Sequence, residues 1–383
     1  MRAVWAVAGA VAAAGVVLAG LGLVIARRLT APASERKYDL TIRGVENSGE
    51  HPVVILDRTP RTAAPGDYCI ILENGGVVRL SRDVENRGPR LVGRAVVGES
   101  RQGLAAGQRA SWSGIYFAGP ADAGLQATDV EIPTDVGPAP AWLIVPQDAP
   151  SSTWAIHIHG LGSTRAGTLR GVQVASEAGS TSLVVTYRND GEGPRVGRGR
   201  SELGAAEVDD VGAAVAYARE NGARNIILFG WSMGAVIALQ LAAEPKLRGI
   251  ITGLVLDSPI LDWVATIKAN CARAGLPAWI GTLAIPWLDC RALARLTGLV
   301  NPVGLRRLDW IARAQELAVP TLVFHGTLDT SSPFKLSTRL STLCPDVVEL
   351  EGFNADHTLS WNSDRERWQA VLFSWATALV SPR

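Results

Sequence analysis

The chain has 383 residues, of which 47% are hydrophobic and 19% charged, a balance that excludes a disordered or low-complexity polypeptide. The net charge is +1, and the first 34 residues hold three of the 37 basic residues and no acid, so the rest of the chain lacks the basic surplus of a nucleic-acid-binding protein. The four cysteines form no C-x-x-C pair, which excludes a zinc ribbon or a thioredoxin-type site, and they are too few for a disulfide scaffold.

The N-terminal segment is uncharged from residue 3 to residue 26. As a helix it would be about 36 Å long, enough to cross a hydrocarbon layer of roughly 30 Å. A cleaved signal peptide is the alternative, with Ala31-Pro32-Ala33 as its cleavage site, but the apolar run is longer than a usual signal core. We therefore predict a single-pass anchor over residues 1–30. Four cationic residues follow it and predict that the large domain lies in the cytoplasm: Arg27, Arg28, Arg36 and Lys37.

Residues 31–124 are typical of a small β-rich module. Short apolar runs at 52–56, 68–72 and 77–80 predict strands, and Asn74-Gly75-Gly76 indicates a hairpin between the last two. No nucleophile, charged pair or metal-ligand spacing stands out. We expect a structural module that packs on, or shields, the domain that follows.

Residues 125–383 change to alternating strands and helices. Two strand-like runs, 129–132 and 141–145, precede this alternation, which predicts a mostly parallel sheet with helices on both faces, an α/β fold. The predicted strands are 154–159, 183–187, 225–229, 253–256, 321–324 and 347–350, and the predicted helices are 169–178, 201–220 (capped by Ser201) and 235–243. The segment from about 260 to 317 lacks strand signals, contains four tryptophans, and is predicted to be a helical lid.

The candidate nucleophile is Ser232, within Gly230-Trp231-Ser232-Met233-Gly234. This G-x-S-x-G pattern follows a predicted strand and opens a predicted helix, which is the context that a nucleophile elbow requires. Glycines are needed at its ends because a Cβ atom there would collide with the neighbouring strand or helix. The turn exposes the serine hydroxyl above the sheet.

On these residues the chain resembles the α/β-hydrolase fold family, over residues 125–383. In that family the nucleophile, the acid and the histidine follow one another along the chain, each on a loop after a strand. The resemblance assigns the acid to Asp329, directly after the predicted strand 321–324, and the histidine to His357, after the last strand. Asp257 also follows a strand and is the alternative acid, since some members draw their carboxylate from that position.

The same resemblance implies an oxyanion hole at His159-Gly160-Leu161. The backbone N–H groups of Leu161 and Met233 would hold the developing negative charge. His157, His159 and His325 are expected to have structural roles. Arg188 is expected to form an ion pair with Asp190 or Glu192, or alternatively to bind a substrate anion.

We therefore predict a serine hydrolase that cleaves a carboxylic ester, with an acyl-chain or lipid-like substrate suggested by an apolar slot under the tryptophan-bearing lid. The reaction would run through an acyl-enzyme, with no cofactor and no metal. A thioesterase, a peptidase or an acyltransferase could use the same triad. The alternative from another class is a membrane-tethered binding protein on a non-catalytic hydrolase scaffold. The sequence does not fix the oligomeric state.

Overall fold

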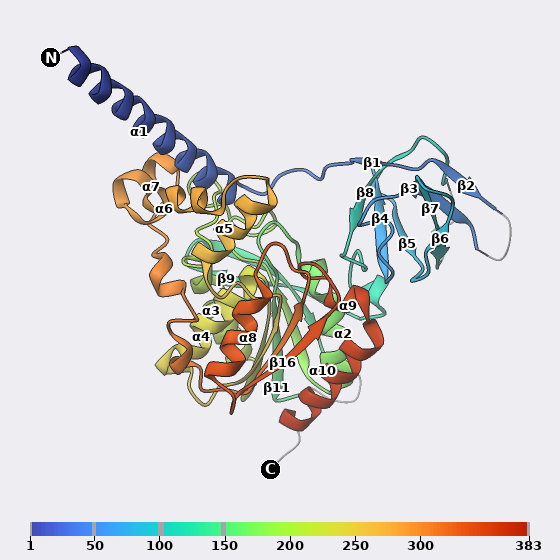
Figure 1. Ribbon diagram of the computed structural model, residues 1–383. Helices are drawn as coiled ribbons and strands as arrows, with labels where there is room; N and C mark the ends of the chain where they lie inside the picture. Colours follow the sequence, from blue (N-terminus) through green and yellow to red (C-terminus); the bar gives the residue numbers. More distant parts are fainter. Residues whose placement is uncertain (1, 48–50, 99–102, 147–150, 381–383) are drawn as a thin grey trace.

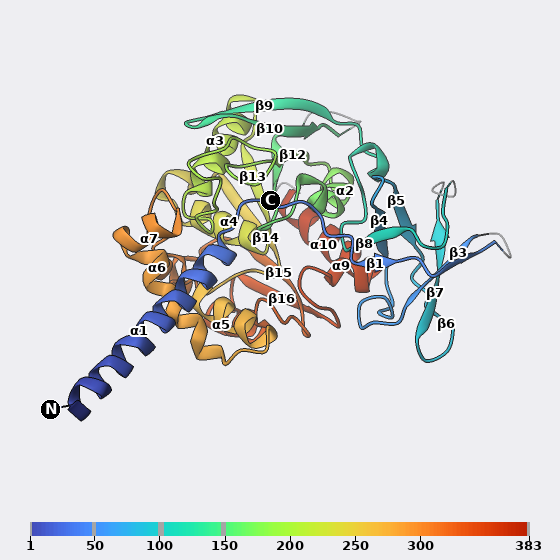
Figure 2. The same ribbon diagram turned by 90° about the horizontal axis from the view of Figure 1, so that it is seen from above.

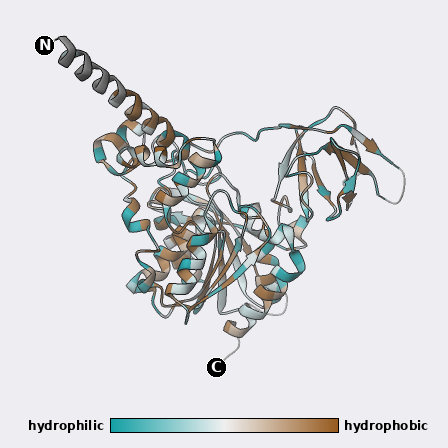
Figure 3. Cartoon of the chain, viewed as in Figure 1, coloured by the Kyte–Doolittle hydropathy of each residue, from teal (hydrophilic) through white to brown (hydrophobic). Residues whose placement is uncertain are grey.

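The computed structural model describes residues 2–47, 51–98, 103–146 and 151–380. Figure 1 shows a long N-terminal helix, a β-sheet module and a larger α/β domain, with an extended linker running from the helix to the module. Figure 3 shows hydrophobic segments in the strands of both the module and the α/β domain.

Helix α1 (Arg2–Leu29) covers the residues that the sequence predicts as a membrane anchor. No helix in the described part of the chain is both long enough and apolar enough to cross a membrane, so the anchor is not confirmed. The end of α1 packs on the protein: Ala26 is fully buried in the main core, and Nη2 of Arg27 donates to the carbonyl of Leu296 over 2.9 Å. Figures 1 and 2 both show α1 running alongside the short helices α6 (Ile285–Asp289) and α7 (Arg291–Thr297).

The β-rich module is seen as predicted. Its strands pair in the order β1-β8-β4-β5-β7-β3-β2, and β6 pairs with β7. Strands β4 and β5 form the predicted hairpin, with Gly75 at a φ of 90° in its turn. The strands are β1 (Leu40–Thr41), β2 (Gly44–Glu46), β3 (Val53–Asp57), β4 (Tyr68–Leu72), β5 (Val77–Leu80), β6 (Glu85–Asn86), β7 (Leu91–Val97) and β8 (Arg109–Ser113).

The module is joined to the α/β domain through the short helix α9 (Ser360–Ser363). Nδ2 of Asn362 donates to the carbonyls of Asp67 (2.5 Å) and Gly114 (3.0 Å), and the backbone N–H of Asp67 donates to the carbonyl of Asn362. Arg82 adds a contact to the carbonyl of Ser363 at 3.0 Å. The module therefore packs on the domain next to the loop that carries His357.

The α/β domain is built on a sheet with the order β16-β15-β14-β13-β11-β12-β10-β9. Its strands from β11 onward run parallel, and β9 and β10 are antiparallel at one edge, which confirms the predicted, mostly parallel sheet. The strands are β9 (Thr128–Thr134), β10 (Gly137–Ile144), β11 (Thr153–Ile158), β12 (Thr181–Val185), β13 (Asn225–Trp231), β14 (Ile251–Asp257), β15 (Thr321–Gly326) and β16 (Val348–Phe353).

Helices cover both faces of this sheet, as alternate side chains of the central strands require. Leu228 enters one core and Phe229 the other. The first face is covered by α3 (Glu207–Glu220), α4 (Met233–Ala243) and α8 (Phe334–Leu343), and the second by α2 (Leu169–Glu177) and α10 (Arg365–Val380).

Helix α3 begins at Glu207, and the predicted cap at Ser201 is wrong. The Ser201 hydroxyl donates to Oε1 of Glu207 over 2.6 Å, and the Glu207 carboxylate also accepts the backbone N–H groups of Glu202 and Gly204. Because Glu207 holds the preceding turn, the chain folds back on itself, with Leu203 at a φ of 59°, before the helix starts.

The segment between β14 and β15, which the sequence predicts to be a lid, is helical. It contains α5 (Trp263–Arg273), a 3-10 helix η4 (Ala278–Ala284), α6 (Ile285–Asp289) and α7 (Arg291–Thr297). Trp263 and Trp310 are buried in the core, whereas 55% of Trp279 is exposed. The last turns of α1 lie against η4 and α6, so the N-terminal helix and the lid form one packed unit.

Candidate active site

Ser232 occupies the turn between β13 and α4. Its φ of 53° and ψ of −111° are strained for a residue with a side chain, and such strain is typical of functional turns. A Cβ on Gly230 would lie 2.6 Å from the backbone nitrogen of Ala235, and a Cβ on Gly234 would lie 2.1 Å from the carbonyl oxygen of Ile158. Only glycine fits at either end, which explains the G-x-S-x-G spacing.

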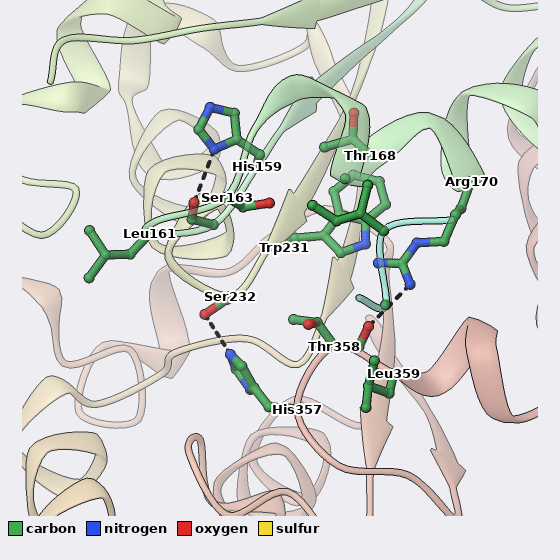
Figure 4. Close-up of a pocket in the computed structure, with 14 residues that line it drawn as sticks. His159, Leu161, Ser163, Thr168, Arg170, Trp231, Ser232, His357, Thr358 and Leu359 are labelled. Atoms are coloured by element: carbon green, nitrogen blue, oxygen red, sulfur yellow. Dashed lines mark hydrogen bonds between the residues drawn. The ribbon is translucent and has the colours of Figure 1, made fainter. Parts of the chain in front are cut away.

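The structure brings the three predicted triad residues together. Nε2 of His357 lies 2.8 Å from Oγ of Ser232, and Nδ1 lies 2.7 Å from Oδ2 of Asp329. A carboxylate can only accept, so the proton sits on Nδ1, and Nε2 is left to accept from the serine hydroxyl. Figure 4 shows the His357 ring directed at Ser232. This arrangement can withdraw a proton from the serine.

The acid is held ionised and in one orientation. Oδ1 of Asp329 accepts the backbone N–H groups of Ser331 and Ser332, both at 2.7 Å, and Oδ2 lies 3.1 Å from Nε2 of His325. Burial opposes ionisation of Asp329, but the hydrogen bonds from His325 and His357 outweigh it and hold the pKa well below its usual range. His325 thus supports the acid directly.

The alternative acid, Asp257, forms no hydrogen bond or ion pair with His357 among the described residues. Its two carboxylate oxygens accept from the Ser258 hydroxyl at 3.1 Å and from Nε1 of Trp368 at 3.2 Å. Burial raises the pKa of Asp257, an effect that the positive charge of Arg170 opposes. The geometry favours Asp329 as the partner of the imidazole.

The loop after β11 carries Leu161, one of the two proposed oxyanion donors, and the other donor, Met233, is the first residue of α4. A Cβ on Gly160 would lie 3.1 Å from Cβ of Ser232, so this loop passes directly beside the nucleophile. Neither the N–H of Leu161 nor that of Met233 donates to another described residue, which leaves both groups free for a ligand. The start of α4 also adds the positive end of a helix dipole at Met233.

A buried polar cluster fixes that loop. Nε2 of His159 lies 3.0 Å from Oδ2 of Asp190, and the hydroxyl of Tyr187 lies 3.0 Å from Nδ1 of the same ring. Burial alone would raise the pKa of Asp190, but the hydrogen bond from His159 and its charge lower it. His159 is therefore a structural histidine, as expected.

Arg188 pairs with neither predicted carboxylate. It lies against Asp210 of α3, with Nη2 2.7 Å from Oδ1 and Nε 2.8 Å from Oδ2, because the strand end brings it over the first turn of that helix. Asp190 is already bound to His159, and Glu192 accepts from Arg165.

A cavity of about 170 Å³ opens beside Ser232 and His357 (Figure 4). None of its lining residues belongs to the lid segment 260–317. This cavity is therefore not the apolar slot that the sequence predicts under the lid tryptophans. Its wall includes the motif residue Trp231 and three residues that no motif indicates: Gly114, Ile115 and Arg170. Gly114 and Ile115 directly follow β8, the last strand of the β-rich module, and no motif indicates that this module contributes to the site.

A second, larger hollow of about 850 Å³ shares Leu161 and Ser163 with the small cavity. The linker after α1, including residues 31–37, forms one of its sides, and the loop 187–192 forms another. Neither Ser232 nor His357 lines this second hollow. In the described part of the chain, no group of three or more candidate ligands is arranged to hold a metal ion.

Comparisons with known proteins agree with this architecture. Residues 41–113 match a domain of unknown function, DUF8805, and comparison with curated proteins finds no match. The fold is similar to the esterase Pf2001 of Pyrococcus furiosus, at 22% identity and a TM-score of 0.55, covering 69% of this chain and 95% of that one. It is also similar to Est1E of Butyrivibrio proteoclasticus, solved with ferulic acid, at 20% identity and a TM-score of 0.51, covering 66% and 100%.

The alpha/beta hydrolase family matches residues 155–376, which include Ser232, Asp329 and His357. This match spans more than half of the chain. The protein therefore belongs to the alpha/beta hydrolase family and is a hydrolase.

Proposed function

We propose that the protein hydrolyses a carboxylic ester through an acyl-enzyme formed on Ser232. The observation that carries this proposal is the continuous hydrogen-bonded path from Oγ of Ser232, through the His357 ring, to the carboxylate of Asp329. His357 takes the proton as the hydroxyl attacks the ester carbonyl, and Asp329 stabilises the imidazolium that results. The proton then passes to the leaving alcohol.

The oxyanion of the tetrahedral intermediate would be held by the N–H groups of Leu161 and Met233. Support comes from the position of Gly160 against Ser232 and from the two unpaired donors. Such donors stabilise the charge that develops during attack and typically contribute a factor of about 10² to 10³ to turnover. Water then attacks the acyl-enzyme, with His357 again acting as the base.

The dimensions of the site favour a short group on one side of the ester. The cavity of about 170 Å³ has no room for a long acyl chain, whereas the adjoining hollow is larger and bears charged residues on its walls. We therefore propose a small, polar ester in preference to the lipid-like substrate that the lid segment suggests. Hydrolysis rates for a series of esters with increasing acyl length test this preference, and we expect the highest rate with the shortest chains.

Labelling with a fluorophosphonate tests the nucleophile. The wild-type protein should be modified at one serine, and Ser232→Ala should not be labelled. Ser341→Ala, on α8 and outside both hollows, is the matched control and should be labelled like the wild type. Equal labelling of Ser232→Ala and the control would remove Ser232 from this role. No labelling of the wild type would favour the non-catalytic binding protein.

A thioesterase, a peptidase or an acyltransferase would use the same triad. Parallel assays with oxygen esters, thioesters and amides of one acid would separate these activities, and we expect the oxygen ester to be preferred.

Attachment to a membrane through residues 3–26, with the catalytic domain on the cytoplasmic side, stays a prediction from the sequence. Fractionation of cells that express the full chain, followed by protease treatment of sealed vesicles, would test both parts.

A further inference from the structure

Arg170 places a buried positive charge on the wall of the small cavity. It lies on α2, and only 4% of the residue is exposed. Its Nη1 atom donates to the carbonyl of Thr358 at 3.2 Å and to Oδ1 of Asn362 at 2.7 Å. Its Nε atom has no hydrogen-bond partner in the described part of the chain. The guanidinium makes no ion pair there, but it lies over the ring of Trp361, with Cζ 5.8 Å from the ring centroid. The edge of the guanidinium that Nε and Nη2 form therefore has no hydrogen-bond acceptor among the described residues.

Trp231 supplies a second unpaired donor to the same wall. The residue is 4% exposed, immediately precedes Ser232, and its Nε1 atom is buried without a partner among the described residues. A Cβ on Gly171 would lie 2.7 Å from Cη2 of the indole, so the ring is pressed against the helix that carries Arg170. Figure 4 shows the guanidinium turned toward the indole nitrogen, both on one side of the cavity.

The charge of Arg170 is only partly balanced within the protein. Burial lowers the pKa of its guanidinium, and the negative charge of Asp257 opposes this shift. Asp257, however, uses its oxygens for Ser258 and Trp368 and is not within ion-pair distance of Arg170. A buried cation with unpaired N–H groups is unfavourable unless a hydrogen-bond acceptor reaches it. A planar carboxylate can accept two parallel hydrogen bonds from one edge of an arginine guanidinium.

We infer that Arg170 and Trp231 form a carboxylate-binding subsite for the substrate, so that the preferred ester carries a second, negatively charged group a few atoms from the scissile bond. This inference rests on the proposed function and narrows its substrate class. Arg170 and Trp231 line the cavity together with Ser232 and His357, and its volume of about 170 Å³ limits the spacer between ester and carboxylate to a short one. Thr358 directly follows His357, and its carbonyl accepts a hydrogen bond from Arg170. This bond connects the subsite to the loop that carries His357.

The test uses two pairs of esters that differ only in charge. The acyl-side pair is monoethyl succinate and ethyl succinamate, and the alcohol-side pair is O-acetylglycolate and O-acetylglycolamide. In one of the pairs, wild-type kcat/KM should favour the carboxylate at least about tenfold, as expected for hydrogen bonds to a charged group. The pair that shows this preference identifies which half of the substrate occupies the cavity.

The variants compared are Arg170→Gln and Trp231→Phe, with Arg165→Gln as the matched control. Arg165 precedes the same helix, contacts Glu192 and lines neither hollow. Arg170→Gln should bring the charged-to-neutral ratio close to one, Trp231→Phe should lower it several-fold, and the control should keep the wild-type ratio. If Arg170→Gln does not fold, the charged-to-neutral ratios of kcat/KM for Trp231→Phe and for the wild type still test the carboxylate subsite.

Failure of the subsite and failure of the proposed function give different results. Hydrolysis of the neutral esters with a wild-type ratio near one in both pairs would overturn the subsite and leave the ester hydrolase standing. If no ester is cleaved, calorimetric titration of the wild type with succinamate still tests the subsite. Binding that Arg170→Gln or Trp231→Phe weakens would support it, and absent or unchanged binding would overturn it.

Discussion

Oδ2 of Asp329 lies 2.7 Å from Nδ1 of His357, although the two residues are 28 positions apart on the loops after β15 and β16. The same oxygen lies 3.1 Å from Nε2 of His325, which also lies 3.0 Å from the carbonyl of Ser332. Two acceptors around Nε2 require that it carries the proton of His325. The acid therefore receives two ring N–H donors in addition to its backbone donors, and this keeps it negative next to His357.

Replacing Asp329 with Asn should lower turnover of an ester by about 10³ to 10⁴, because an amide can stabilise the wrong tautomer of His357 and cannot balance the imidazolium charge. Steady-state kinetics measure this loss, and circular dichroism checks folding. Asp257→Asn is the comparison, since its carboxylate is bound to Ser258 and Trp368. A larger loss of turnover in folded Asp257→Asn would contradict the assignment of the acid.

A second prediction concerns the loop after β11, which contains Gly160 and Leu161. Gly160→Ala would place a methyl group 3.0 Å from the carbonyl oxygen of Trp231 and 3.1 Å from Cβ of Ser232, pushing the loop away from the nucleophile. We expect kcat to fall by about 10²-fold or more, the usual effect of losing an oxyanion donor. Gly119→Ala, whose new Cβ meets nothing within 4 Å, is the control and should retain wild-type kcat. Equal kcat for the two variants would show that the loop does not contribute.

Much of the α/β domain follows from local sequence. The runs at 225–229 and 321–324 are apolar and rich in β-branched residues, and they form the buried strands β13 and β15. The glycines around Ser232 are dictated by close backbone contacts, so the nucleophile turn is readable without coordinates.

Other features depend on which elements meet in space, and no local pattern encodes them. Arg188 pairs with Asp210, 22 positions away, because a strand end meets the start of a helix. Ile115 reaches the cavity only because the β-rich module packs on α9, and Arg170 has the sequence context of an ordinary helix residue. The packing of α1 on the lid is likewise set by tertiary contacts, since an apolar helix could equally lie in a lipid phase.

Stability should decrease in mild acid because of His157. This residue on β11 is fully buried, and burial lowers its pKa to about 3 from a usual value of 6.5. Between pH 6.5 and pH 3 the unfolded chain binds a proton that the folded chain excludes. The free energy of unfolding should therefore fall by about 1.4 kcal/mol per pH unit in this range.

Urea unfolding at pH 7.5 and pH 5.5 measures this effect. His157→Phe keeps an aromatic ring beside Phe229 and Trp231 but cannot bind the proton, so it should lose less stability between the two pH values than the wild type. Because all other titrating groups are common to both proteins, the difference isolates His157. The same loss in both proteins would refute this explanation.

Helix α1 contains two glycines that distinguish its packed side from its open side. A Cβ on Gly22 would lie 2.2 Å from the carbonyl oxygen of Leu283 and 3.0 Å from Cδ1 of Trp287, whereas a Cβ on Gly20 meets nothing within 4 Å. Both residues lie inside the helix, so valine changes helix propensity equally at the two positions.

Gly22→Val should therefore separate α1 from the lid, with a loss of about 1–3 kcal/mol from the clash, while Gly20→Val should resemble the wild type. Thermal unfolding and limited proteolysis under identical solvent conditions compare the two variants. We expect a lower midpoint and faster cleavage between residues 260 and 317 only for Gly22→Val. If both variants unfold and are cleaved alike, α1 does not stabilise the lid, and the contact of Gly22 with Leu283 has no energetic consequence.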